Sequence, residues 1–579
     1  MTHREQPEIR DLGIIGDQKT CALLDNNGTI SWYCPERFDT PAVCSLLLDV
    51  EQGGFWAVES EAAFQKRGYL GRSSVLRTEF ATFTLTDWMP YGNDELEGIC
   101  RLTSESPTAI EHHIKLRDRN GLDRVDVKLR DDGSALVIGD RQVYILLASH
   151  PLQLDDETIR IKIPSRQEGW VHFSSSKEKI PVVNTALIKK SLAGTLSAWE
   201  EKLAMVDYTG SYENQVVNSC RAICLMTHIP SGGIVAAATT SLPEGYGNGR
   251  NYDYRFVWLR DSAMIVSAHI RAIGMTGDAM AFLRFLEQAK EKNQEKRFAP
   301  FYDLEMGVAP SLEELPLRGY KGEQPVVIGN KANHQLQLDA NANVLLAAKL
   351  IYEKKEGKPQ WSMVEKIADF VADNWQEKDH GIWEETTKQH FTSSKVIAAK
   401  ALEFIAVHAE TEKQKKKWHE AASNIRKFVA ENCLTQSGAY AVYAGSQHVD
   451  VTAALYPVWL YCEPGSNEMR VTMQEIEATL KEGTLYHRRL ECFDSNKEGV
   501  FLAASLWVAQ YYVTQGNLDK ARTIIDATLE FANDLGYLAE EGDVATGEMM
   551  GNFPQTFVHA SLMGVIVDLK EAEKKQGIA

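Results

Sequence analysis

Two acidic segments stand far apart in the chain. The first, GIWEETTKQHFTSSK, places Glu384 and Glu385 directly after Trp383, and the second, LAEEGDVATGEMMGNFPQTFVH, contains Glu540 followed by Glu541. Adjacent carboxylates repel each other, and burial near an indole disfavours ionisation, so one of them can stay protonated near neutral pH and act as a general acid. Hydrolysis of a glycosidic bond uses two carboxylates in different environments. Either segment alone is typical of a solvated surface, whereas the pair indicates one shared site.

A third segment combines hydrogen-bonding side chains with aromatic rings. GGIVAAATTSLPEGYGNGRNYDYRFVWLRD ends with Trp258, Arg260 and Asp261 at the expected start of a helix. An adjacent guanidinium and carboxylate can hold vicinal hydroxyl groups, one donating and one accepting, while an indole covers the apolar face of a sugar ring. The structural alternative is a helix-start aspartate paired with an arginine. A fourth segment, GYKGEQPVVIGNKANHQLQLD, offers His334 or Gln335 to a ligand, although a histidine near a helix start is more often structural.

These segments interrupt a regular pattern of helices. Helical spacing of apolar residues predicts twelve helices, near residues 215–227, 259–273, 278–292, 334–354, 361–375, 393–409, 411–432, 450–462, 468–481, 499–514, 517–534 and 553–571. Apolar helices such as FLAASLWVAQYYV alternate with charged ones such as TEKQKKKWHEAASNIRKFV, which indicates an inner ring covered by an outer ring. Six such hairpins closing on themselves form an (α/α)6 barrel. An open helical array is the alternative.

The N-terminal part has the pattern of a β-structure instead. In CALLDNNGTISWYC, Asn26, Asn27 and Gly28 separate two expected strands, and the runs near 78–88, 123–129 and 142–147 are rich in β-branched and aromatic residues. We expect an antiparallel β-sandwich. The expected domains are the sandwich over residues 1–185, a linker helix over 186–210, and the helical barrel over 211–579.

Composition and charge restrict the class of protein. The chain has 579 residues, of which 44% are hydrophobic and 25% charged, as in an ordinary globular protein. Its net charge of −18 would repel nucleic acid and an anionic membrane surface. The sequence has no signal peptide and no apolar run long enough to span a membrane, so we expect a cytoplasmic location. Nine scattered cysteines indicate reduced thiols, and without a CxxC pair no metal site is expected.

Many ordered motifs carry a resemblance to a known family. They run from IRDLGIIGDQKTCALLDNNGTISWYCPERFDTPAVCSLLLD through AAATTSLPE, NYDYRFVWLRDS, GYKGEQPVVIGN, QLQLD, GIWEE, FTSSKV and EGVFLAASLWVAQ to GNFPQTFVH. In these motifs the sequence resembles glycoside hydrolase family 15, the glucoamylase-like family. The similarity is to its bacterial and archaeal branch, which includes trehalases and exo-acting glucosidases. The resemblance covers nearly the whole chain. Many motifs in the same order are much stronger evidence than any one of them alone.

The resemblance implies a fold and a set of roles. It implies an N-terminal β-sandwich followed by an (α/α)6 catalytic barrel, with no cofactor. By motif position Glu384 resembles the family's general acid and Glu540 its general base. The implied substrate-binding residues are Arg260, Asp261, Glu385, Trp258 and Trp383. Departures from the usual pattern, at Ala238, Tyr252 and Lys331, lie around the site and leave both glutamates in place.

The reaction expected from the resemblance is hydrolysis in one displacement with inversion, which requires room for water beside the base. The leading expectation is an exo-acting hydrolase that releases glucose from the non-reducing end of α-glucans or gluco-oligosaccharides. A trehalase of the same family is the alternative, followed by a phosphorolytic enzyme and a non-catalytic sugar-binding protein. The PERFDT turn is the part of the sandwich expected to reach the site, if any does. The oligomeric state stays open, with a homo-oligomer as one option.

Overall fold

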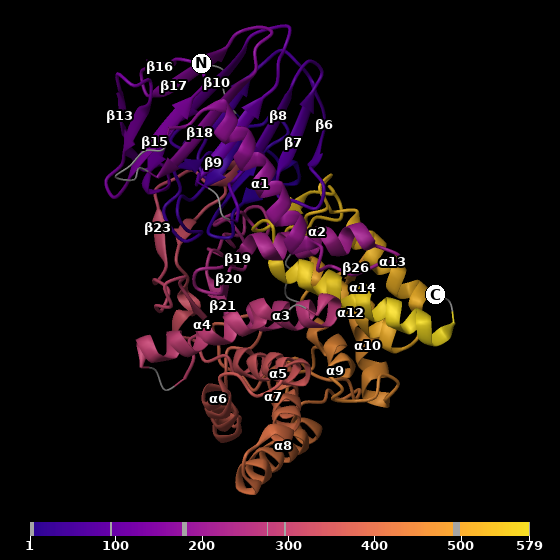
Figure 1. The fold of residues 1–579 in the computed structure, drawn as a ribbon. Helices are drawn as coiled ribbons and strands as arrows, with labels where there is room; N and C mark the ends of the chain where they lie inside the picture. Colours follow the sequence, from indigo (N-terminus) through magenta and orange to yellow (C-terminus); the bar gives the residue numbers. More distant parts are fainter. Residues whose placement is uncertain are drawn as a thin grey trace.

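The chain folds into a β-sandwich, at the top of Figure 1, and a helical barrel beneath it. The structure, a computed structural model, describes residues 5–92, 95–175, 182–274, 276–294, 297–489 and 498–577. In these residues the antiparallel sandwich and the helical barrel expected from the sequence are both present. No helix among them is long and apolar enough to cross a membrane.

Two antiparallel sheets form the sandwich. The first runs in the order β1 (Gly13–Gly16), β2 (Cys21–Leu24), β3 (Ile30–Tyr33), β5 (Phe55–Glu59), β10 (Ile110–Lys115), β17 (Thr158–Ile163) and β16 (Leu152–Asp155), with β4 (Cys44–Ser45) paired to β3. The second runs in the order β13 (Asp126–Leu129), β14 (Ala135–Ile138), β15 (Val143–Ala148), β18 (Gly169–Ser175), β9 (Ile99–Thr103), β8 (Thr84–Trp88), β7 (Leu76–Phe80) and β6 (Phe64–Tyr69). A separate pair joins β11 (Arg117–Asp118) to β12 (Asp123–Arg124).

Alternation of apolar and polar residues explains these strands. In β7, with sequence LRTEF, the first, third and fifth side chains are buried and the others are partly exposed. Such a period of two places one face of the strand against the opposite sheet. The turn between β2 and β3 contains Gly28, whose φ of 74° lies in the left-handed region that glycine adopts without strain.

Helix α1 (Thr185–Leu203) leads from the sandwich to the barrel and covers part of the second sheet. It begins at Asn184, whose side chain accepts a hydrogen bond from the Leu187 amide. Its Ile188 packs into a small buried cluster with Trp88 and Trp170 of the sheet. The helix is thus packed on the sandwich by its own hydrophobic core.

The barrel consists of two concentric rings of helices. The inner ring contains α3 (Leu259–Ile273), α5 (Leu338–Lys354), α7 (Thr392–Ile405), α9 (Leu455–Val458), α12 (Leu502–Thr514) and α14 (Thr556–Gln576), each packed on the next, and α14 closes the ring on α3. The outer ring contains α2 (Glu213–Met226), α4 (Gly277–Asn293), α6 (Trp361–Asn374), α8 (Glu412–Asn432), α10 (Asn467–Thr479) and α13 (Leu518–Leu529). This arrangement is the (α/α)6 barrel, and the open array is wrong.

Residue composition separates the two rings. In α12 every residue from Leu502 to Val513 is buried, whereas α8 buries one stripe that includes Trp418 and Ile425. The helix expected over 450–462 is much shorter: a 3-10 turn, η6 (Val451–Ala454), leads into α9. The chain then takes a left-handed conformation at Leu460, where φ is 60°, and this ends the helix.

Inner and outer helices alternate along the chain, so the inner helices run in one direction and their N-terminal ends meet at one mouth of the barrel. The connections that enter this mouth carry short strands: β19 (Thr227–His228), β20 (Gly233–Ile234), β21 (Val257–Trp258), β22 (Phe301–Tyr302), β23 (Glu313–Leu315), β24 (Val326–Ile328), β25 (Lys481–Glu482), β26 (Leu485–Tyr486), β27 (Val500–Phe501), β28 (Glu541–Gly542) and β29 (Met549–Met550). Single 3-10 turns complete the described chain, η1 (Ile9–Asp11), η2 (Arg119–Gly121), η3 (Tyr320–Gly322), η4 (Lys331–His334) and η5 (Ala406–His408).

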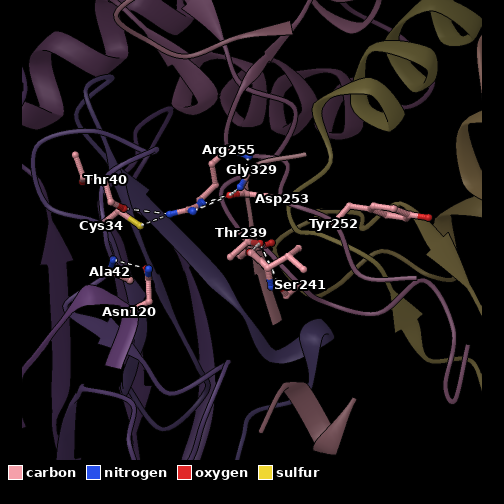
Figure 2. A network of polar contacts seen from close by, with 12 residues as sticks. Cys34, Thr40, Ala42, Asn120, Thr239, Ser241, Tyr252, Asp253, Arg255 and Gly329 are labelled. Atoms are coloured by element: carbon pink, nitrogen blue, oxygen red, sulfur yellow. Dashed lines mark hydrogen bonds and ion pairs between the residues drawn. The ribbon is translucent and has the colours of Figure 1, made fainter. Parts of the chain in front are cut away.

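A buried polar network joins the sandwich to one of these connections (Figure 2). Arg255 donates to both carboxylate oxygens of Asp253, at 2.9 and 2.7 Å, and reaches the sandwich at the Thr40 carbonyl, 3.1 Å away, and at Cys34. Asp253 also accepts from the Gly329 amide at 3.2 Å. Because both charges of this pair are buried, the network holds the connection firmly against the sandwich. The cysteines described are all free thiols, and Cys492 lies outside the described residues.

Candidate active site

A cavity of about 390 Å³ opens at the mouth where the inner helices begin. Its walls come from the connections before α3, α5, α7, α12 and α14. The structure brings all the site residues expected from the sequence into this one cavity: Trp258, Arg260, Asp261, Trp383, Glu384, Glu385 and Glu540. The two glutamates that lie far apart in the sequence therefore face a common space.

Glu384 lies on the connection between α6 and α7 and is held by several donors. Its Oε1 accepts hydrogen bonds from Trp258 Nε1 at 2.9 Å and from Arg260 Nη2 at 3.3 Å. Its backbone has a φ of 58°, and its carbonyl oxygen accepts from Gln335 Nε2 at 3.0 Å. The side chain keeps 22% of its surface exposed. The unusual backbone conformation aims the carboxylate into the cavity, and no described residue bonds its second oxygen, Oε2.

Glu540 lies at the start of the strand pair β28–β29 and is more deeply buried, with 4% of its surface exposed. Its Oε1 accepts a hydrogen bond from the Tyr254 hydroxyl at 2.9 Å. Among the described residues, nothing donates to its buried Oε2. Burial, and next the charge of Glu244, raise the pKa of Glu540 well above its ordinary value of 4.5, while Arg488 and Tyr254 oppose this shift. A carboxylate oxygen that no described residue bonds can accept a proton from water.

The backbone opposite Glu540 approaches so closely that only glycine fits. Gly551 follows β29 and has a φ of 83°. A Cβ atom at this position would lie 2.9 Å from Glu540 Cβ and 3.1 Å from Glu540 Oε2. The glycine therefore allows the hairpin to support the carboxylate without a clash.

Arg260 and Asp261 lie at the start of α3 and bind each other. Arg260 Nε donates to Asp261 Oδ1 at 3.1 Å, and burial raises the pKa of Asp261 although Arg260 opposes this. Behind them lies Asp339 of α5, whose oxygens have no hydrogen-bond partner among the described residues and whose Oδ2 is 4.0 Å from Arg260. Burial raises the pKa of Asp339 to about 7. The guanidinium thus lies among carboxylates at the wall of the cavity.

Aromatic packing fixes the other wall. Trp383 donates from Nε1 to Asp450 at 2.6 Å and stacks on Trp507, with ring centroids 6.0 Å apart. Glu385 forms an ion pair with Arg489 at the cavity. Trp258, expected to cover a sugar ring, stacks on Phe301 with centroids 4.5 Å apart, and its N–H is directed at Glu384.

Several residues of the site were missed by sequence reasoning. Tyr254, Glu244 and Arg488 line the cavity around Glu540, and Gln335, one of the two residues left open, contacts the Glu384 carbonyl. The signal for Tyr254 was present, because it lies in the same NYDYRFVWLRD segment as Arg260. Nothing local in the sequence links Glu244 or Arg488 to the base, because their side chains meet only in the folded chain.

The positions that depart from the family pattern have different surroundings. Lys331 and Tyr252 line the cavity, and Tyr252 stacks parallel to Tyr254 with centroids 6.4 Å apart. Ala238 is buried, and its carbonyl accepts from Trp32 of the sandwich at 2.8 Å. Lys331 and Tyr252 can therefore contact a ligand, whereas Ala238 belongs to the interface behind the site.

The PERFDT turn of the sandwich supports the site from behind and does not line it. Asp39 accepts from the Leu304 amide at 3.1 Å, and Thr40 accepts from Arg255, the residue after Tyr254. The residues that line the cavity all lie between Ala236 and Phe557, in the helical part of the chain.

Three buried acidic residues lie close enough together to suggest a cation site. Oxygens of Glu244, Glu498 and Glu541 lie within 4.8 Å of one another. Arg250 and Arg488 already bind this group: Arg250 Nε lies 3.0 Å from Glu244 and 2.7 Å from Glu498, and Arg488 Nη2 lies 2.6 Å from Glu498. The guanidinium groups supply the positive charge, so this donor set does not fit a metal ion.

A second cavity of about 330 Å³ lies among the inner helices. It is bounded by small residues such as Ala268, Ser561 and Gly564 and by Trp507. None of the site residues expected from the sequence lines it, so the chemistry belongs to the first cavity.

Comparison with known proteins covers both parts of the chain. The family model described as glycosyl hydrolases family 15 matches residues 210–567, and the one described as trehalase-like, N-terminal, matches residues 1–163. The chain is 30% identical to trehalase 1 of Sulfolobus acidocaldarius, over 97% of this chain and 99% of that protein. It is 29% identical to the trehalase of Thermoplasma volcanium, over 98% of this chain and 95% of that protein. The trehalase of Mycolicibacterium smegmatis is 28% identical, over 98% of this chain and 92% of that protein.

Among solved structures, a bacterial glucoamylase in complex with acarbose superposes with a TM-score of 0.74 at 14% identity. The match covers all of this chain and 98% of the glucoamylase. At this identity the similarity establishes the fold, and it extends over the sandwich as well as the barrel.

Proposed function

Since the chain belongs to family 15 of the glycosyl hydrolases, we propose that it is a trehalase that cleaves α,α-trehalose with inversion, with Glu384 as general acid and Glu540 as general base. The observation that carries the choice of substrate is that relatives aligned over nearly the full length, sandwich and barrel alike, are named trehalase. This favours the trehalase alternative over the glucan-releasing enzyme first expected from the sequence. The likeness to glucoamylase concerns the fold.

The arrangement of donors around Glu384 supports its role as the acid. Trp258 and Arg260 donate to Oε1, so that oxygen acts as an acceptor and the transferable proton belongs on Oε2. In the proposed step Oε2 gives this proton to the glycosidic oxygen as the bond from the anomeric carbon to that oxygen breaks. The leaving glucose then departs as a neutral alcohol.

The surroundings of Glu540 support the complementary role. Its Oε2, to which no described residue donates, would accept a proton from a water molecule while the water oxygen forms a bond to the anomeric carbon on the opposite face. Arg260 and Asp261 line the same cavity and offer the donor and acceptor that neighbouring hydroxyl groups require. No step needs a metal or an organic cofactor.

Early product analysis tests the proposal. Inversion of trehalose gives one β-glucose, from the attacked ring, and one α-glucose, from the leaving ring, whereas retention gives two α-glucose molecules. ¹H NMR in the first minutes should therefore show equal amounts of the two anomers, and ¹⁸O from labelled water should enter only the β-anomer.

Parallel assays on maltose, isomaltose and longer α-glucans separate the alternatives. We expect the highest kcat/KM for trehalose. Faster release of glucose from glucans would support the glucoamylase-like enzyme, and glucose 1-phosphate formed only with phosphate present would indicate phosphorolysis. Binding without any turnover would make the chain a sugar-binding protein.

A further inference from the structure

Glu244 shares the hydroxyl group of Tyr254 with Glu540. The Tyr254 oxygen lies 2.9 Å from Glu540 Oε1 and 3.1 Å from Glu244 Oε1. Glu244 lies on the connection between β20 and β21 and is 2% exposed, so it is cut off from bulk water. The Tyr254 hydroxyl thus bridges the two carboxylates, Glu244 and Glu540.

The three groups have too few donor hydrogens for both carboxylates. A phenol carries one donor hydrogen, so two ionised carboxylates cannot both receive it. While both are ionised, one carboxylate oxygen stays without a donor and the two negative charges repel each other across the shared hydroxyl group. Once Glu540 takes a proton from water on Oε2, its Oε1 becomes an uncharged carbonyl oxygen, and Tyr254 can donate fully to Glu244.

Two arginines bind the other oxygen of Glu244. Its Oε2 accepts from Arg250 Nε at 3.0 Å and from Arg488 Nη2 at 3.4 Å. Charge-assisted bonds of this kind favour the carboxylate over the carboxylic acid. Two guanidinium groups therefore face the Glu244 carboxylate on its Oε2, while Oε1 is bonded to Tyr254.

From this geometry we propose that Glu244 is a positioning residue for the base: it competes for the Tyr254 proton and so increases the affinity of Glu540 for the proton of the attacking water. The inference rests on the proposed role of Glu540. The strain of the ionised pair is relieved as the proton transfers, so the network favours the transition state over the resting state.

The charges that face Glu540 come from several segments. Glu244 and Asp261 raise its pKa and Arg488 lowers it, with Glu541 as the adjacent residue in the chain. After burial, Glu244 makes the largest contribution to the raised pKa. Removal of Asp261 would also remove a substrate contact, so Glu244 is the position at which the effect can be tested cleanly.

The test compares pH profiles of kcat/KM for trehalose. Activity that needs an ionised Glu540 is present above the pKa of that carboxyl and is lost as the pH falls through it. Glu244→Gln removes the competing charge, so the acidic limb should move down by about one pH unit and kcat should fall about tenfold because the base is weaker. Glu244→Asp keeps the charge and should restore the parent limb.

Two further variants complete the design. Tyr254→Phe removes a donor to the ionised base, so its acidic limb should move up, opposite to Glu244→Gln. Glu498→Gln is the matched control, because Glu498 binds the same two arginines and is not bonded to Tyr254. The proposal would be overturned if the acidic limb of the pH profile stayed in place in Glu244→Gln. It would also be overturned if that limb moved equally far in Glu498→Gln.

A second readout separates this proposal from the choice of substrate. Difference infrared titration follows the carboxyl band that is absent from Glu540→Gln, and it reports the protonation of Glu540 without any turnover. A lower titration midpoint in Glu244→Gln would support the inference even for a parent that does not cleave trehalose. If the unsubstituted protein cleaved none of the α-glucosides, that result would contradict only the proposed function.

Discussion

Contrasting surroundings distinguish the two glutamates at the scale of single residues. Glu384 is partly exposed and receives donors from Trp258 and Arg260 on one oxygen. Glu540 is buried, receives one donor from Tyr254 and faces further carboxylates. The two carboxylates therefore have different environments, as a division of labour between an acid and a base requires.

Substitution of Glu384 should depend on the leaving group. We expect Glu384→Gln to lower kcat for trehalose by at least about 10²-fold, because the glucose leaving group needs a proton. Fluoride leaves without one, so α-glucosyl fluoride should lose less than about tenfold. Glu540→Gln, the companion variant, should abolish turnover of both substrates while sugar binding, measured by calorimetry, persists. Equal losses on both substrates in Glu384→Gln would contradict the acid role.

At the scale of elements, short strands beside the inner helices position several residues of the site. Glu540 directly precedes β28, and the turn after β29 places Gly551 against it. Trp258 ends β21 and leads into α3, where Arg260 and Asp261 begin the helix. Strands held by ladder hydrogen bonds fix side chains more accurately than free loops do, and the inner helices provide the rigid base.

Gly551→Ala tests the close approach at the hairpin. The added Cβ would lie 2.9 Å from Glu540 Cβ, so the carboxylate must shift, and kcat should fall at least about tenfold. Gly547→Ala is the matched control, because Gly547 has a φ of 74° in the same hairpin and nothing within 4 Å of an added Cβ. Both variants should lose about 1 kcal/mol of unfolding free energy from the left-handed conformation. Similar kcat values for the two variants would show that contact with Glu540 is unimportant.

At the scale of the whole molecule, the sandwich acts as a support for one wall of the site. Arg255 links Asp253 to Thr40 of the sandwich directly after Tyr254 in the chain (Figure 2). Farther along the interface, Arg67 of the sandwich binds Asp534 at 2.7 Å. The wall that carries Tyr254 therefore depends on contacts with a part of the chain that lines none of the cavity.

Loss of Arg255 should damage both stability and activity. Arg255→Met leaves the buried carboxylate of Asp253 unpaired, so the free energy of unfolding should fall by about 3–5 kcal/mol. Turnover should also fall because Tyr254 loses its support. Arg124→Met removes an 80% exposed arginine from the same sandwich and should cost less than about 1 kcal/mol. Denaturant midpoints and trehalose assays measure both effects, and an active, stable Arg255→Met protein would contradict the coupling.

Local patterns in the sequence determined the two-part architecture and the rings of the barrel. Strand alternation in segments such as β7 and the contrast between the apolar α12 and the charged α8 follow from which faces must be buried, and such periodicity is readable without tertiary structure. The motifs also singled out the glutamates at 384 and 540, and the structure places both of them at one cavity.

Only the tertiary structure decided which side chains meet. Glu244 shares the Tyr254 hydroxyl with Glu540, and Arg255 joins the site to the sandwich, across long stretches of chain. Such contacts depend on distances set by loops and by the closure of the ring, and no spacing along the sequence encodes them. The short length of α9 was likewise not readable from the sequence. The left-handed conformation at Leu460 interrupts the helical pattern expected over residues 450–462.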